Sequence, residues 1–190
     1  HEILERNRDL ADVALVGIRT RGVVIAERIA AVLKAAGGVT MPVGSLDITF
    51  YRDDLTRLAH APIVKRSDLG PEVTDRTVVL VDDVLYTGRT IRAALNELFD
   101  YGRPARIRLA ALVDRGGREL PISADFAGAD VTVTPGDSIE LTRDAQGRLR
   151  ATAPHARLLG IDPAPAFDWS SVVVGMAADT PGETVVALSL

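Results

Sequence analysis

The chain contains three short, continuous runs of apolar residues, each long enough to form one strand. They are VALVGI at 13–18, TVVLVD at 77–82 and RIRLAALVD at 106–114. Runs without polar alternation are typical of strands buried on both faces of a sheet. A further segment, GSLDITFYRDD at 44–54, has apolar residues at Leu46, Ile48 and Phe50. This alternation predicts a strand in which Asp47 and Thr49 face the opposite way.

Two segments between these runs carry apolar residues at helical spacing. The first follows RTRG and stops at the glycine pair 37–38, and the second follows Gly88 and stops at Gly102. The apolar stripes are Ile25, Ala26, Ile29, Ala30 and Leu33 in the first segment, and Ile91, Ala94, Leu95 and Leu98 in the second. Strands that alternate with helices predict βαβ units, and so an α/β fold with a parallel sheet flanked by helices.

The rest of the chain has weaker patterns. Residues 52–76 have little periodicity and predict a long loop or loose hairpin, and a loop of that length is usually functional. The last sixty or so residues predict a hairpin around 144–147, a proline-rich connector DPAPA, and two strands around 180–182. The patterns leave open whether this tail is a second small domain or a covering layer.

Composition narrows the class of protein. The 190 residues are 47% hydrophobic and 25% charged, which is ordinary for one globular domain. The net charge of −4 disfavours bulk attraction to nucleic acid or anionic membranes, although it allows a local basic patch. There is no cysteine, no apolar run of membrane-spanning length, and no signal peptide in the charged first residues. We therefore expect a cytoplasmic protein with no membrane partner.

Two adjacent acids and a small-residue turn follow the second apolar run, in VVLVDDVLYTGRT at 78–90. The turn Thr87–Thr90 opens a helix, and a helix N-terminus offers N–H groups and a positive dipole to phosphate. A P-loop and a G-x-G-x-x-G motif are both missing, which disfavours the common nucleotide-binding loops. Asp82 and Asp83 beside a phosphate site suit a sugar phosphate, whose hydroxyls need acceptors while its phosphate needs donors.

Residues 79–90 also resemble the phosphoribosyl pyrophosphate (PRPP) signature of type I phosphoribosyltransferases. A wider set of segments resembles the PyrR family, whose members regulate pyrimidine operons and are also uracil phosphoribosyltransferases. These segments are HEILERN, LVGIRTRG, VGSLDITFYRDDLT, VDDVLYTGRTIRAALNEL, GRP and ALVDRGGRELPI. The resemblance implies a type I phosphoribosyltransferase fold with a flexible flap and a small hood, a core at 1–128, and a divergent β-rich segment at 129–190.

The resemblance also implies a role for each matching residue. Asp82 and Asp83 would bind the ribose hydroxyls and act in catalysis together with Arg52, which lies at the root of the flap with Tyr51, Asp53 and Asp54. The 5′-phosphate loop would be Thr87, Gly88, Arg89 and Thr90, and the pyrophosphate loop would be Arg19, Thr20, Arg21 and Gly22. Val113, Asp114 and Arg115 would lie near the base, and His1, Arg6 and Arg118 on an RNA face.

The implied reaction converts uracil and PRPP into UMP and pyrophosphate, with Mg²⁺ bound through PRPP rather than by a dedicated protein site. Implied partners are these ligands, a stem-loop of pyrimidine-operon mRNA, and further copies of the same chain. The sequence departs from the family pattern at Gly117, where the family has histidine, at Ser123, where it has arginine, and over 128–135. Two alternatives therefore stay open: an RNA-binding sensor of PRPP or UMP with negligible turnover, and a phosphoribosyltransferase for another base without an RNA role.

Overall fold

The computed structural model describes residues 2–7, 10–52, 66–70, 72–132, 139–143, 149–154, 157–158, 175–176 and 183–188. Its main sheet has the strand order β2-β1-β3-β4-β5-β8. The first five strands are parallel, and β8 pairs antiparallel with β5. Their bounds are β1 Val13–Ile18, β2 Val43–Leu46, β3 Thr77–Leu85, β4 Arg106–Asp114, β5 Phe126–Thr132 and β8 Arg157–Leu158. The predicted α/β fold with a parallel sheet is confirmed.

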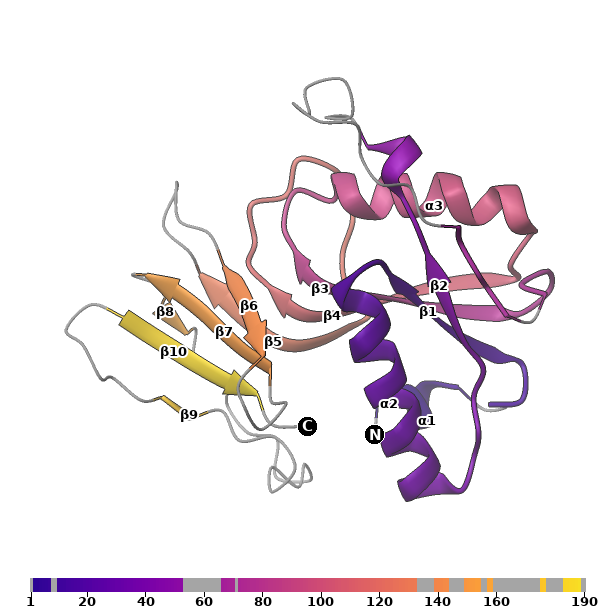
Figure 1. Cartoon of the computed structure of the whole chain (residues 1–190), viewed down its shortest axis with the longest axis horizontal. Helices are drawn as coiled ribbons and strands as arrows, with labels where there is room; N and C mark the ends of the chain where they lie inside the picture. Colours follow the sequence, from indigo (N-terminus) through magenta and orange to yellow (C-terminus); the bar gives the residue numbers. More distant parts are fainter. Residues whose placement is uncertain are drawn as a thin grey trace.

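Helices cover both faces of this sheet, with α2 (Arg21–Gly37) on one side and α3 (Arg89–Tyr101) on the other (Figure 1). Successive side chains of a strand point to opposite faces. Val79 and Val81 of β3 therefore join the core under α2, while Val78 and Leu80 join the core under α3. Burial on both faces explains why the strand sequences show no polar alternation. Both predicted helical stripes are confirmed.

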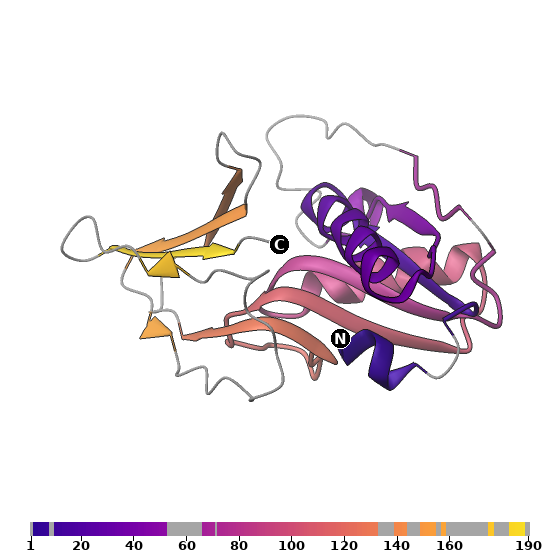
Figure 2. The ribbon, with the colours of Figure 1, turned by 90° about the horizontal axis from the view of Figure 1, so that it is seen from below.

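The short helix α1 (Glu2–Arg6) lies beside the start of β5 (Figure 2). Ile3 is buried in the same core as Phe126. Arg6 donates from Nη1 to the carbonyl oxygen of Asp125 at 3.1 Å, and its guanidinium lies 5.5 Å from the centroid of the Phe126 ring. Arg108 lies 5.8 Å from the same ring. The arginine predicted for an RNA face thus lies at the β5 side of the sheet.

The predicted strand over 44–54 is wrong beyond Leu46. The chain forms a 3₁₀ turn there, η1 (Thr49–Tyr51), instead of continuing β2. Asp47 is only 8% exposed, and its Oδ1 accepts hydrogen bonds from both the main-chain N–H and the hydroxyl of Thr49. An aspartate that bonds the backbone two residues ahead favours a turn over a strand. Phe50 consequently points outward and is 67% exposed.

The described tail forms a second sheet with the order β6-β7-β10-β9. The predicted hairpin pairs β6 (Glu140–Arg143) with β7 (Leu149–Pro154), and the two predicted strands at the end are β9 (Gly175–Met176) and β10 (Glu183–Leu188). Strand β5 continues the main sheet to Thr132, past residue 128. The division at 128 and the role of the tail stay predictions. Among the described residues, no helix is long and apolar enough to cross a membrane.

Candidate active site

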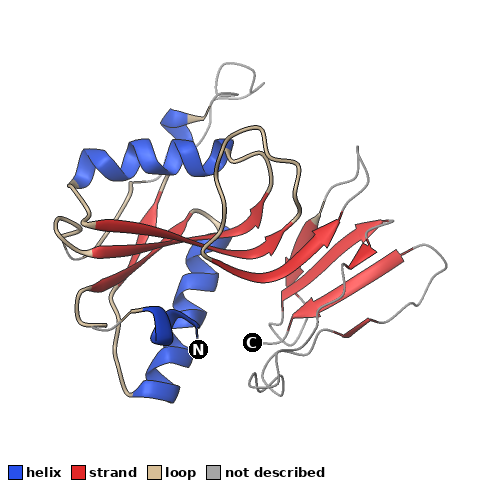
Figure 3. Ribbon diagram, turned by 180° about the vertical axis from the view of Figure 1, so that it is seen from behind, coloured by secondary structure: helices blue, strands red, loops and turns tan. Residues whose placement is uncertain are grey.

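The loops that follow β3 and β4 rise from the same edge of the parallel sheet (Figure 3). This edge holds the carboxyl ends of the strands, where open α/β sheets bind their ligands. The loop Arg19–Gly22, which follows β1, reaches the same edge because β1 is the other neighbour of β3. The structure thus brings together three of the predicted segments: the pyrophosphate loop 19–22, the acid pair, and the phosphate loop, by which we mean residues 87–90.

Close backbone packing places the loop 19–22 against β3. A Cβ built on Gly22 would collide with the carbonyl oxygen of Val81, and it would lie 3.4 Å from the Cα of Asp82. Only glycine allows this approach. The Arg19–Thr20 peptide bond in the same loop is cis. The side chain of Arg21 lies next to the acid pair, with Nη1 3.3 Å from Oδ2 of Asp83.

The two acids have different surroundings. Asp82 is 6% exposed, and its Oδ1 accepts a hydrogen bond of 2.9 Å from the main-chain N–H of Asp83. Burial, and secondly the negative charge of Asp83, raise the pKa of the Asp82 carboxyl well above its ordinary value. Asp83 is more accessible: its Oδ1 accepts from the N–H of Val84 at 2.9 Å, and its Oδ2 lies 3.3 Å from Nη1 of Arg21. Of the two carboxylates, that of Asp83 is therefore the more accessible to a ligand.

The phosphate loop ends at the N-terminus of α3. Gly88 has φ of 91° and is buried against Leu120 and Ile122, so a left-handed residue turns the chain into the helix. Thr87 Oγ1 accepts a hydrogen bond of 3.3 Å from the N–H of Arg89. The side chains of Arg89 and Thr90 are exposed at the first turn of α3. The positive end of a helix with exposed side-chain donors suits a phosphate group.

Arg19 connects the loop 19–22 to β2. Arg19 donates from Nη2 to Ser45 Oγ at 2.7 Å, while its buried Nε has no partner among the described residues. Arg52 directly follows η1. The preceding Tyr51 is held on α3, because its hydroxyl donates to Asp100 and its carbonyl oxygen accepts from Arg92 at 3.3 Å. Asp53 and Asp54, at the predicted root of the flap, lie outside the described residues, as does the rest of the range 53–65.

The predicted base segment Val113–Arg115 ends β4, next to the acid pair of β3. Val113 is fully buried, and Asp114 accepts a hydrogen bond of 2.9 Å at Oδ1 from the N–H of Gly116. The guanidinium of Arg115 stacks on the ring of Tyr86, 4.0 Å from its centroid. Sequence reasoning did not single out Tyr86, although its position between the acids and the phosphate loop was a signal that it lies near them.

Of the residues predicted for an RNA face, the structure describes Arg6 and Arg118, and it does not bring these two together. His1 lies outside the described residues, and Arg6 packs beside Phe126 at the start of β5. Arg118 lies in the loop after β4, where its guanidinium forms an ion pair with Asp114 and is bonded to main-chain carbonyl oxygens. The side chain is thus directed into the protein. Its RNA contact stays a prediction.

The described residues contain no group of three or more histidine, aspartate or glutamate side chains that could hold a metal ion. Mg²⁺ commonly binds one or two carboxylates together with ligand phosphates. The accessible carboxylate at the end of β3, that of Asp83, fits this mode of binding, in which ligand phosphates supply further oxygens. Among the described residues, it is not part of a metal cage of protein side chains alone.

Comparisons with known proteins identify the class of this site. The family described as phosphoribosyl transferase domain matches residues 2–137. A hypoxanthine phosphoribosyltransferase of Trypanosoma cruzi has the same fold, with a TM-score of 0.50 at 20% identity over 67% of this chain and 64% of that one. The chain carries a phosphoribosyltransferase domain of type I architecture.

Relatives narrow the class to one family. The bifunctional protein PyrR of Chloroflexus aurantiacus is 59% identical over 152 residues, which are 80% of each chain. The bifunctional protein PyrR of Roseiflexus sp. is 60% identical over 139 residues, which are 73% of this chain and 76% of that protein. The chain belongs to the PyrR family.

Proposed function

We propose that this chain is a uracil phosphoribosyltransferase, which forms UMP and pyrophosphate from uracil and PRPP, and that it also regulates pyrimidine genes by binding mRNA in response to uridine nucleotides. Membership of the PyrR family supports both parts. The observation that carries the enzymatic part is the meeting of three segments at one sheet edge. These are the loop 19–22, the acid pair and the phosphate loop.

Each segment suits one part of PRPP. The carboxylate of Asp83 accepts hydrogen bonds from the ribose hydroxyls, and the first turn of α3 binds the 5′-phosphate. Arg19 and Arg21 supply positive charge that stabilises the pyrophosphate as its bond to the ribose breaks. The uracil nitrogen forms the new bond to the same ribose carbon, and its proton is released to water. No covalent intermediate with the protein is needed.

Magnesium belongs to this proposal as a companion of PRPP. Asp83 is the residue that would hold it, together with oxygens of the ligand. When bound, the ion supplies positive charge that neutralises the departing pyrophosphate. The chain itself supplies orientation: Gly22 keeps the loop 19–22 against β3, and Gly88 directs the phosphate loop into α3.

The enzymatic part is tested by pyrophosphate release. We expect release when uracil, PRPP and Mg²⁺ are all present, and none after chelation or without uracil. Adenine, guanine, hypoxanthine and orotate serve as competing bases, because Gly117 and Ser123 depart from the family pattern near the base segment. If pyrophosphate is released with one of these bases and not with uracil, the chain is a phosphoribosyltransferase for another base. No release with any base would contradict the enzymatic proposal.

The regulatory part is tested by RNA binding. We expect a pyrimidine-leader stem-loop to bind more tightly than a shuffled RNA of equal length, and more tightly still with UMP. The affinity should fall as salt rises, because phosphate contacts release counterions. Equal affinity for both RNAs would contradict this part. If the chain binds PRPP and binds the RNA selectively but shows no turnover, the alternative of an RNA-binding sensor of PRPP or UMP is favoured. A cytoplasmic location and assembly of several copies also stay predictions.

A further inference from the structure

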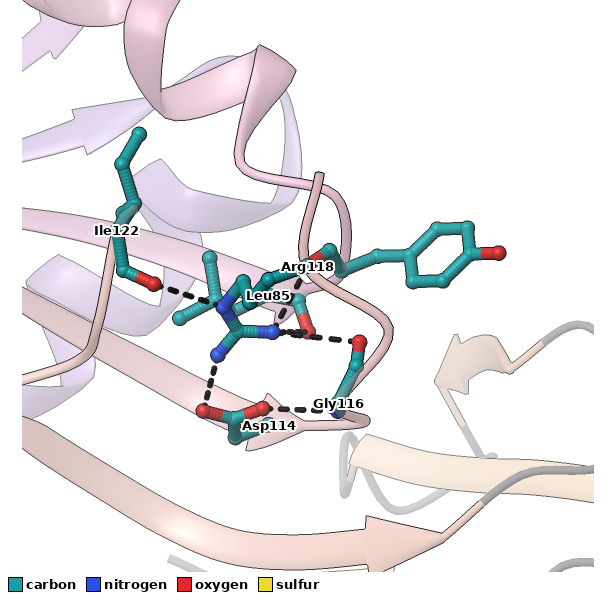
Figure 4. Close-up of polar contacts among 6 residues, drawn as sticks. Leu85, Asp114, Gly116, Arg118 and Ile122 are labelled. Carbon is teal, nitrogen blue, oxygen red and sulfur yellow. Dashed lines mark hydrogen bonds and ion pairs between the residues drawn. The ribbon is translucent and has the colours of Figure 1, made fainter. Parts of the chain in front are cut away.

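Arg118 lies between two loops that the proposed reaction uses (Figure 4). One is the chain after β3, at Leu85 and Tyr86, which leads into the phosphate loop. The other follows β4 and covers residues 115–122, and we call it the base loop. The side chain of Arg118 is 22% exposed, so most of it is enclosed by these two segments.

The guanidinium of Arg118 bonds both loops. Within the base loop, Nε donates to the carbonyl oxygen of Ile122 at 2.8 Å and Nη1 to that of Gly116 at 3.3 Å. Across to the other loop, Nη1 lies 2.8 Å from the carbonyl oxygen of Tyr86 and 3.3 Å from that of Leu85. Nη2 forms an ion pair with Asp114. A planar guanidinium offers its donors in a rigid fork, which a lysine ammonium cannot match.

Neighbouring contacts connect the same two loops. The N–H groups of Glu119 and Leu120 each donate to the carbonyl oxygen of Thr87 at 3.0 Å. The carboxylate of Glu119 lies 2.7 Å from Nε of Arg89. This ion pair is half exposed, so it contributes little by itself. Arg118 is the residue at the centre of this connection, because it reaches the end of β4 as well as both loops.

We propose that Arg118 is a positioning residue, which sets the distance between the base segment Val113–Arg115 and the phosphate loop. The inference rests on the proposed function. A nucleotide such as UMP touches both places at once, whereas ribose 5-phosphate touches only one. Arg118 therefore matters for ligands that bridge the two loops. It acts through Asp114 and the main-chain carbonyl oxygens, without touching the ligand.

Calorimetry with two ligands tests this role. In Arg118→Met we expect the affinity for UMP to fall by about tenfold or more, which is about the net contribution of one hydrogen bond to the nucleotide. The affinity for ribose 5-phosphate should hardly change, because this ligand contacts the phosphate loop alone. Arg118→Lys keeps the charge beside Asp114 but not the fork, so it should restore little of the UMP affinity. Arg106→Met, an exposed arginine at the other end of β4, is the matched control.

Hydrogen exchange without ligand gives a second measurement. In Arg118→Met the amides of Gly116, Glu119 and Leu120 should exchange faster, since they bond to Asp114 or Thr87. Amides of β1 should keep their protection. Unchanged exchange at all three positions would overturn the inference.

The binding outcomes separate the inference from the proposed function. A wild-type chain that binds neither ligand overturns the proposed function. A wild-type chain that binds both, with an Arg118→Met variant that loses both affinities equally or neither, overturns the inference alone. Loss of RNA affinity with intact UMP binding would make Arg118 an RNA contact and would also overturn the positioning role.

Discussion

Arg21 and Asp83 form an ion pair of 3.3 Å across a sequence separation of 62 residues. Arg21 begins α2, and Asp83 lies near the end of β3. Strands β1 and β3 are parallel neighbours, so the loop after β1 and the end of β3 meet at one edge. The cation proposed for the pyrophosphate group and the acid proposed for the ribose thereby lie side by side.

Asp83→Asn should damage PRPP use while leaving the fold intact. A hydrogen bond to a charged group contributes about 1.5–3 kcal/mol, so we expect kcat/KM for PRPP to fall by about 10- to 100-fold. The partner Arg21 is more than half exposed, so loss of the ion pair should hardly change the melting temperature. Initial rates and thermal unfolding check this. Unaltered kinetics would remove Asp83 from the proposed site.

Asp82→Asn should make the protein more stable at neutral pH. The pKa of Asp82 is raised in the folded state, so ionisation of this carboxyl opposes folding. Wild-type stability is then full below the ordinary aspartate pKa of about 3.9 and is lost as pH rises toward the raised value. Asparagine does not ionise, and its side-chain oxygen can still accept from the N–H of Asp83.

The measurement for Asp82→Asn is the difference in melting temperature between variant and wild type from pH 4 to pH 8. We expect this difference to increase with pH. Asp12→Asn, at an exposed position, is the control for loss of one carboxyl group. A difference that stays constant with pH would show that burial does not hinder ionisation of Asp82.

Gly22→Ala should separate the loop 19–22 from β3. The added methyl would overlap the carbonyl oxygen of Val81, and overpacking of this kind costs about 1–3 kcal/mol. We expect weaker pyrophosphate and PRPP binding by calorimetry. Gly38→Ala is the matched control, because a Cβ there meets nothing within 4 Å. Its positive φ of 66° costs about 1–2 kcal/mol, and PRPP affinity should not change. Equal PRPP affinity in both variants would contradict the role of Gly22.

Gly117→Ala should displace Tyr86. A Cβ at residue 117 would lie 2.5 Å from Cε2 of the tyrosine ring, and φ there is 72°. We expect a loss of about 1–2 kcal/mol from backbone strain alone, and more from the overlap. In a Tyr86→Ala background the overlap disappears, so a double-mutant cycle should give a coupling of about 0.5–3 kcal/mol. If denaturant unfolding shows that the two losses of unfolding free energy are additive, the Tyr86 ring moves aside at no cost.

The strands and helices could be predicted because the residues that specify each of them are neighbours in the sequence. The run 78–81 is apolar at every position, and the structure buries it on both faces. The glycines at 38 and 102 follow the ends of α2 and α3, as predicted. The strand over 44–54 failed for a local reason as well. The alternation at Leu46, Ile48 and Phe50 was real, but the turn made by Asp47 and Thr49 outweighed it.

The sequence by itself determined the α/β class and the family signature around Asp82 and Asp83, because periodicity and motif are properties of neighbouring residues. Only the tertiary structure decided how the acids differ. Asp82 is buried, while Asp83 faces Arg21. The tertiary structure also decided the direction of the Arg118 side chain. Its spacing to Asp114 was visible along the chain, but its carbonyl acceptors Leu85 and Tyr86 lie at the end of β3 and just beyond it, and pairing of β3 with β4 brings them within reach.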